Sequence, residues 1–126
     1  MRNVLNWFEI PVADMARAVA FYDAILGIEL KAEEIMGMLT AFFPYDWEGE
    51  GAGGGLVQGP GYVPSSEGTL VYLNGGDGLA TVLDKVEGAG GSVVMPKSSI
   101  GENGFMAIFI DSEGNKVGLH SPVVNA

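Results

Sequence analysis

The chain of 126 residues contains a single histidine, His120, and no cysteine. Imidazole chemistry would therefore have to use His120, whereas thiolate nucleophiles and sulfur-rich zinc sites are excluded. A transition-metal site needs three or four ligands drawn from imidazole, carboxylate and thiolate groups. The first question is therefore whether His120 takes part in a reaction or only lines a pocket.

Glu9 is the second residue whose position could support chemistry. In NWFEIPV (6–12), apolar residues at every second position alternate with Trp7 and Glu9, which is typical of a β-strand. A carboxylate on such a strand needs water, a partner or a ligand. Glu9 and His120 together would make a general base with its orienting carboxylate. The alternative is that both are ordinary hydrogen-bonded side chains.

Composition limits the partners of the chain. Its formal net charge is −10, which would repel a phosphate backbone, so we expect no binding to nucleic acid. No apolar run approaches the roughly 20 residues needed to cross a bilayer, and the N-terminus shows no signal-peptide cleavage pattern. Together with the absence of cysteine, these features predict a cytoplasmic protein that does not contact a membrane.

The sequence repeats itself at an offset of 63 residues. Asp14 precedes an apolar periodic run that ends at Gly27, and Asp77 precedes a similar run that ends near Gly90. The same offset relates two further pairs, which are Gly55-Leu56 with Gly118-Leu119 and Phe42 with Phe105. A repeat of this length predicts one domain made of two modules, residues 1–63 and 64–126.

Each half predicts the same order of elements. In the first half, the strand over 6–12 precedes a helix capped by Asp14, and strands follow near 28–35, 37–44 and 54–58. In the second half, a strand over 69–74 precedes a helix capped by Asp77, and strands follow near 92–96, 104–110 and 115–121. The predicted class is α+β, with two tandem βαβββ modules that form a curved eight-stranded mixed sheet. The sheet would make a cup with the helices outside.

The chain resembles the vicinal oxygen chelate superfamily, which includes glyoxalase I, bleomycin-resistance proteins and extradiol dioxygenases. The resemblance rests on WFEIPVADMARAVAFYDAILG (7–27), DKVEGAGGSVVMPK (84–97) and FIDSEGNKVGLHS (109–121). It implies two tandem modules and a homodimer, with cups built within one chain or across two. In the metal-dependent members, four ligands lie on the first and last strands of each module.

Carried over to this sequence, the resemblance places Trp7, Gly55, Leu70 and Gly118 at the four ligand positions. None of these side chains can coordinate a cation, so we expect no metal and no cofactor. Without a cation, the lyase, dioxygenase or thiol-transferase reactions of the metal-dependent members lose their main electrostatic contribution.

Strand parity then predicts which residues line the cup. If Trp7 faces the cavity, Glu9 does too, because side chains two residues apart share a face. The candidate catalytic residues are the polar groups Glu9, Tyr72 and His120. The predicted ligand-binding residues are Trp7, Glu9, Phe42, Gly55, Leu70, Tyr72, Phe105, Gly118 and His120. The two glycines would let a flat ligand approach the backbone.

Three functions remain open at this point. The first is a metal-free binding protein, similar to the bleomycin-resistance proteins, that takes a small and largely apolar molecule into its cup. The second is a lyase, dioxygenase or isomerase that uses Glu9 and His120 as displaced metal ligands or as base and orienter. The third is an interaction protein whose cup is packed shut. The sequence favours the first and does not name the ligand.

Overall fold

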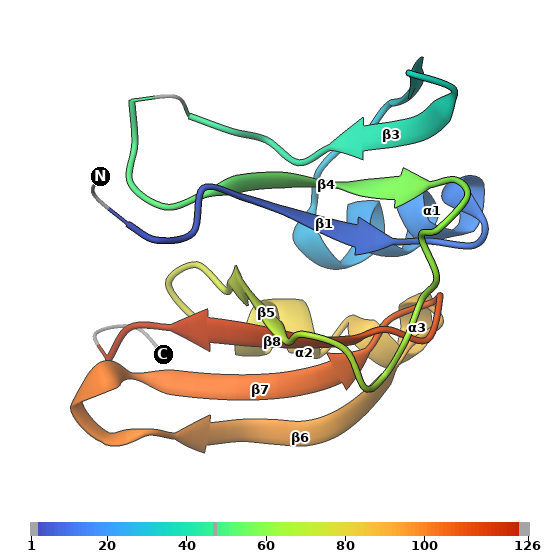
Figure 1. Cartoon of the computed structure of the whole chain (residues 1–126). Helices are drawn as coiled ribbons and strands as arrows, with labels where there is room; N and C mark the ends of the chain where they lie inside the picture. The colour runs from blue at the N-terminus through green and yellow to red at the C-terminus, as the bar shows by residue number, and fades with distance from the viewer. Residues whose placement is uncertain (1–2, 47, 124–126) are drawn as a thin grey trace.

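The strands form two four-stranded sheets in the computed structural model, which describes residues 3–46 and 48–123 (Figure 1). The first sheet has the order β1–β4–β3–β2, with strands Trp7–Pro11, Gly53–Gln58, Met38–Phe42 and Ala32–Ile35. The second has the order β5–β8–β7–β6, with strands Val71–Asn74, Lys116–Ser121, Phe105–Ile110 and Ser92–Ser99. In each sheet the first strand of the module runs parallel to the last, and the other pairs are antiparallel.

This topology confirms an α+β fold made of two βαβββ modules. The register of the first and last strands keeps the 63-residue offset, because Glu9 pairs with Gly55 and Tyr72 pairs with Gly118. The eight strands are nevertheless not one continuous hydrogen-bonded sheet within the described ranges, since each module closes its own set of four.

The offset fails on the third strands. Phe42 lies opposite Gly55, but the residue opposite Gly118 is Ile108, so the true counterpart of Phe42 is not Phe105. Phe105 instead packs against the buried core, on the other face of its sheet. The segment joining β3 to β4 is longer than the one joining β7 to β8, and the register shifts accordingly.

The first helix forms where the sequence predicts it. α1 spans Met15–Leu26; the Asp14 carboxylate accepts a hydrogen bond from the Arg17 amide at 3.1 Å, as an N-cap does. Gly27 ends the helix in the left-handed region at φ 66°, which glycine adopts without steric cost.

The second helix differs from the prediction. In place of one helix capped by Asp77, the chain forms two single turns, α2 (Ala80–Leu83) and α3 (Val86–Ala89), neither with a side-chain cap. Between the two turns the Lys85 amide donates to the Val82 carbonyl at 3.1 Å, an i→i−3 bond that interrupts the α-helical pattern, and Thr81, Val82 and Gly88 have low helix propensity. A short 3₁₀ turn, η1 (Gly101–Asn103), lies between β6 and β7.

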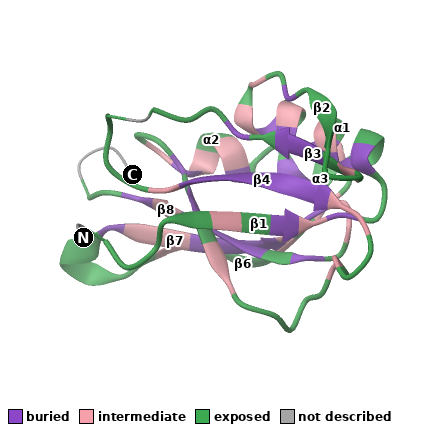
Figure 2. Cartoon of the chain, turned by 45° about the horizontal axis from the view of Figure 1, so that its top comes forward, coloured by how far each residue is buried: buried purple, intermediate pink, exposed green. Residues whose placement is uncertain are grey.

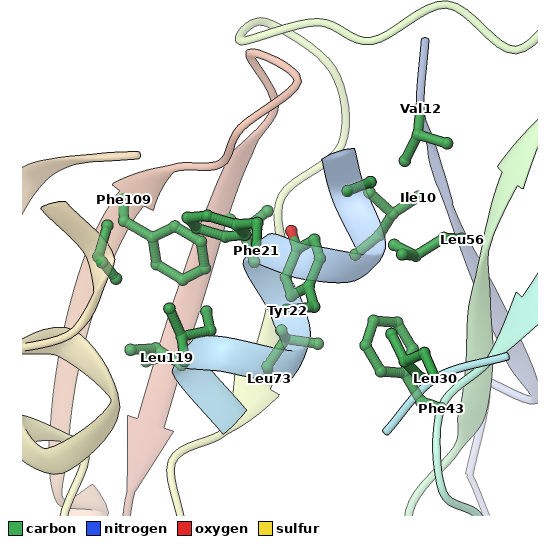
Figure 3. Packing of buried hydrophobic residues seen from close by; sticks show 14 of the residues in the cluster. Ile10, Val12, Phe21, Tyr22, Leu30, Phe43, Leu56, Leu73, Phe109 and Leu119 are labelled. Atoms are coloured by element: carbon green, nitrogen blue, oxygen red, sulfur yellow. The ribbon is translucent and has the colours of Figure 1, made fainter. Parts of the chain in front are cut away.

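One hydrophobic core serves both modules. The helices lie on one side of the strands in Figure 1, and α1 reaches both sheets. Phe21 meets Phe109 of the second sheet at a ring-centroid distance of 5.9 Å, while Tyr22 meets Phe43 of the first module at 5.6 Å (Figure 3). The exposed start of β1 and the buried β4 are visible in Figure 2. At 12 residues, α1 is too short to cross a bilayer, and the other described helices are shorter still.

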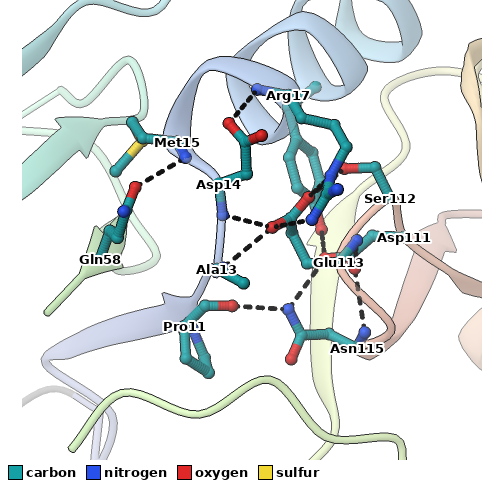
Figure 4. Close-up of polar contacts among 11 residues, drawn as sticks. Pro11, Ala13, Asp14, Met15, Arg17, Gln58, Asp111, Ser112, Glu113 and Asn115 are labelled. Atoms are coloured by element: carbon teal, nitrogen blue, oxygen red, sulfur yellow. Dashed lines mark hydrogen bonds and ion pairs between the residues drawn. The ribbon is translucent and has the colours of Figure 1, made fainter. Parts of the chain in front are cut away.

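The turn of the second module, DSEGN (111–115), forms hydrogen bonds with residues of the first module. Asp111 is 3% exposed and accepts hydrogen bonds from Tyr22 Oη at 2.7 Å and from Asn115 Nδ2 at 3.1 Å. The Tyr22 pKa is raised well above its ordinary value, first by burial and then by the Asp111 charge. Asn115 Nδ2 also donates to the Pro11 carbonyl at 2.8 Å (Figure 4).

Glu113 caps the start of α1 from the opposite module. Its Oε1 accepts from the amides of Ala13 and Asp14 at 2.9 and 2.8 Å, and its Oε2 accepts from Arg17 Nε at 2.6 Å (Figure 4). Burial alone would raise the pKa of Glu113, but the hydrogen bonds from Arg17 and the two amides outweigh it and hold the pKa below the ordinary value. The first helix is therefore completed by residues about 100 positions away.

Candidate functional site

The larger cavity lies at the seam between the two modules and has a volume of about 1020 Å³. Its wall is largely apolar, as is usual for small-molecule sites. The first module contributes Phe8, Leu26, Ile28, Phe43, Pro44 and the segment Glu50–Gly54. The second module contributes Tyr72, Leu73, Asn74, Ile100, Met106, His120 and Pro122.

A smaller groove of about 350 Å³ lies at another part of the same seam. Trp7 and Glu9 from β1 form one side of it, and Lys116 lies on the second module. The connecting segment between the modules contributes Val63, Ser65, Gly68 and Thr69.

The structure divides the predicted ligand-binding residues into three groups. Tyr72 and His120 line the larger cavity, whereas Trp7 and Glu9 line the groove. The remaining five line neither space; they are Phe42, Gly55, Leu70, Phe105 and Gly118. Among them, Phe42 contacts Trp7 edge-to-face at 5.7 Å between ring centroids, on the exposed face of the first sheet.

Glu9 and His120 have different hydrogen-bond partners in the structure. Glu9 accepts a hydrogen bond from Tyr62 Oη at 2.9 Å, and this bond raises the pKa of Tyr62. His120 Nε2 is 2.7 Å from the Asn103 carbonyl oxygen. The two side chains thus have separate partners and line separate spaces.

The carbonyl partner shows which nitrogen of the His120 ring donates a hydrogen bond. A backbone carbonyl can only accept a hydrogen bond, so Nε2 must carry the hydrogen in this contact. In the neutral ring, Nδ1 then keeps its lone pair and can accept a hydrogen bond or a proton. The Asn103 carbonyl therefore orients the His120 ring in this structure.

The space beside the glycines at the predicted ligand positions is occupied by other atoms of the protein. A Cβ on Gly118 would lie 2.5 Å from the Tyr72 ring; at Gly53, which is not a predicted ligand position, a Cβ would likewise lie 2.3 Å from the Tyr45 ring. At Gly55 the nearest atom is the Ala41 carbonyl oxygen, at 2.7 Å. The flat groups that approach the backbone at Gly118 and Gly53 are the protein's own rings.

We therefore expect Gly118→Ala to displace the Tyr72 ring rather than unfold the chain. Tyr72 is 47% exposed and its ring can turn away, so the free energy of unfolding should fall by only about 1 kcal/mol. The Tyr72→Ala background removes the clash, and the same substitution should there cost less than half as much. Urea denaturation of the native protein, the two single variants and the double variant measures this coupling; equal costs in both backgrounds would show that the ring does not depend on Gly118.

Sequence reasoning missed most of the residues that line the larger cavity. Phe8, Phe43 and Asn74 were predicted only as members of the strands over 6–12, 37–44 and 69–74. A signal for Asn74 was present, because it lies two positions after Tyr72 and so shares its face. The strand predicted over 54–58 forms as β4 and begins one residue earlier, at Gly53, so its first two glycines reach the cavity wall.

Within residues 3–46 and 48–123, three or more histidine, aspartate or glutamate side chains nowhere gather in a group that could hold a metal ion. The positions Trp7 and Leu70 carry apolar side chains, and Gly55 and Gly118 carry none.

The model of the Glyoxalase/Bleomycin resistance protein/Dioxygenase superfamily matches residues 4–119. Among curated proteins, the chain is similar to CFP32 of Mycobacterium bovis, which is provisionally named a glyoxylase, with 28% identity over 117 residues. That alignment covers 90% of this chain and 44% of CFP32, so the chain spans less than half the length of this relative.

Solved structures share the fold at low sequence identity. Glyoxalase I from Zea mays superposes with a TM-score of 0.65 at 21% identity, over 93% of this chain and 45% of the maize chain. A glyoxalase/bleomycin resistance protein from Albidiferax ferrireducens gives a TM-score of 0.66 at 14% identity, over 94% of this chain and 98% of its own. These likenesses establish the fold alone.

Proposed function

The chain belongs to the Glyoxalase/Bleomycin resistance protein/Dioxygenase superfamily, and we propose that it binds a small, largely apolar molecule in the cavity between its two modules. The observation that carries this proposal is the cavity of about 1020 Å³, with apolar walls from both modules and a short row of polar side chains. Such a composition suits a ligand that is mostly desolvated and oriented by a few hydrogen bonds.

Charge favours the same class of ligand. The net charge of −10 disfavours anions, and Glu50 is the charged residue among those lining the cavity. The polar groups Tyr72, Asn74 and His120 all come from β5 and β8, so a bound molecule would place its polar end against the second module. Its apolar body would then lie against Phe8 and Phe43.

The proposal is tested with N-phenyl-1-naphthylamine, an uncharged probe whose fluorescence rises in apolar surroundings. Met106→Trp would fill part of the cavity, and we expect it to weaken probe binding at least tenfold. Met95→Trp is the matched control, because Met95 is 38% exposed and lines neither cavity nor groove; its affinity should stay within twofold of the native value. Equal affinities for both tryptophan variants would place the probe elsewhere and refute the proposal.

A further inference from the structure

We propose that Asn74 and His120 recognise a neutral head group that carries a hydrogen-bond acceptor next to a donor, as in a lactam. The inference rests on the proposed function, since it assigns the head-group chemistry of the same cavity.

The two side chains are neighbours on one wall. Asn74 of β5 and His120 of β8 are register partners, and both line the larger cavity. Paired strands lie roughly 4.8 Å apart, so adjacent groups on them can contact adjacent atoms of one ligand. Met106 of β7 is the next partner of His120 and continues this wall with an apolar side chain.

Asn74 presents a donor. Its Oδ1 accepts a hydrogen bond from the Gly76 amide at 2.8 Å, which fixes the orientation of the side-chain amide. Nδ2 then retains both hydrogens for a ligand, because this group has no hydrogen-bond acceptor among the described residues.

His120 presents an acceptor beside that donor. Nε2–H donates to the Asn103 carbonyl at 2.7 Å, and in the neutral ring Nδ1 then carries the lone pair. The complementary ligand edge is a carbonyl, for Asn74, next to an N–H or O–H, for His120. A carboxylate would oppose the Nδ1 lone pair and the net charge of the chain, and a lone ketone would leave Nδ1 unsatisfied.

The test compares 2-quinolinone, a bicyclic lactam, with 1-methyl-2-quinolinone by isothermal titration calorimetry. The methyl group removes the donor, and we expect the native protein to bind the methylated probe at least tenfold more weakly. Asn74→Asp keeps the oxygen that accepts from Gly76 and replaces the donor with a second acceptor. We expect it to weaken lactam binding at least tenfold.

Asn6→Asp is the matched control, because it adds the same charge at an exposed residue outside both the cavity and the groove. Lactam binding by Asn6→Asp should stay within twofold of native. Equal affinity for the two probes, or an Asn74→Asp effect no larger than that of Asn6→Asp, would overturn the inference. Failure of both quinolinones to bind would overturn it as well, while the Met106→Trp comparison would still decide the proposed function.

Discussion

Replacing Asp111 with alanine should lower the free energy of unfolding by about 4 kcal/mol, a loss large enough to leave a marginal domain partly unfolded. The carboxylate is 3% exposed and accepts four hydrogen bonds, two from side chains and two from backbone amides. Alanine would leave these donors, including the buried Tyr22 hydroxyl, without an acceptor in a part of the protein that water cannot easily reach. Urea denaturation followed by circular dichroism measures the loss.

Two variants separate the free energy lost with the hydrogen bonds from the free energy lost with the side-chain volume. Asp111→Asn keeps one acceptor oxygen and should cost about half as much. Tyr22→Phe removes one donor and leaves the other three in place, so it should cost about 1 kcal/mol. The Tyr22→Phe, Asp111→Ala double variant should be more stable than the sum of the single losses predicts, by about 1 kcal/mol. Strict additivity would show that the two residues do not act together.

Glu113→Gln is expected to lower the free energy of unfolding by about 2 kcal/mol at pH 7. The neutral amide can replace one oxygen, but its NH₂ group then faces a donor, either the Arg17 guanidinium or the amides of Ala13 and Asp14. The Glu113 side chain is fully buried, so the mismatch is poorly relieved by solvent.

The effect should depend on pH with a definite sign. Because the folded state holds the pKa of Glu113 below its ordinary value, its carboxylate contributes full stability above the unfolded pKa of about 4.3. That contribution is lost as the pH falls through the lower folded pKa. The difference between native protein and Glu113→Gln should therefore be constant from pH 6 to 7 and shrink below about pH 4. A difference unchanged at low pH would mean that the charge of Glu113 is irrelevant.

The elements of this fold were predictable where local chemistry decides them. Asp14 and Gly27 bound α1 because an aspartate cap and a left-handed glycine are local features. The 63-residue offset correctly related Glu9 with Tyr72 and Gly55 with Gly118, since those strands pair directly. The second helix was predicted less well, because hydrophobic periodicity alone does not reveal low helix propensity or the absence of an N-cap hydrogen bond.

The site was harder to predict, because it depends on distances between modules. Strand parity placed Tyr72 and His120 on one face, and both line the larger cavity, but it could not show that Glu9 lies at a different part of the seam. The Phe42–Phe105 match failed because loop length, not sequence identity, sets the register of the third strands. The orienting partner of His120 is a backbone carbonyl, which any residue at position 103 could supply. No pattern of side chains could have identified it.

The fastening of α1 by DSEGN (111–115) also bears on how the chain folds during synthesis. The amides at the start of α1 meet their acceptor only when residue 113, about 100 positions later, has left the ribosome. The first half must therefore wait for contacts of very high sequence separation, which slow folding and make it cooperative. A gene built from two similar halves would in this way encode a single folding unit, in which neither half folds without the other.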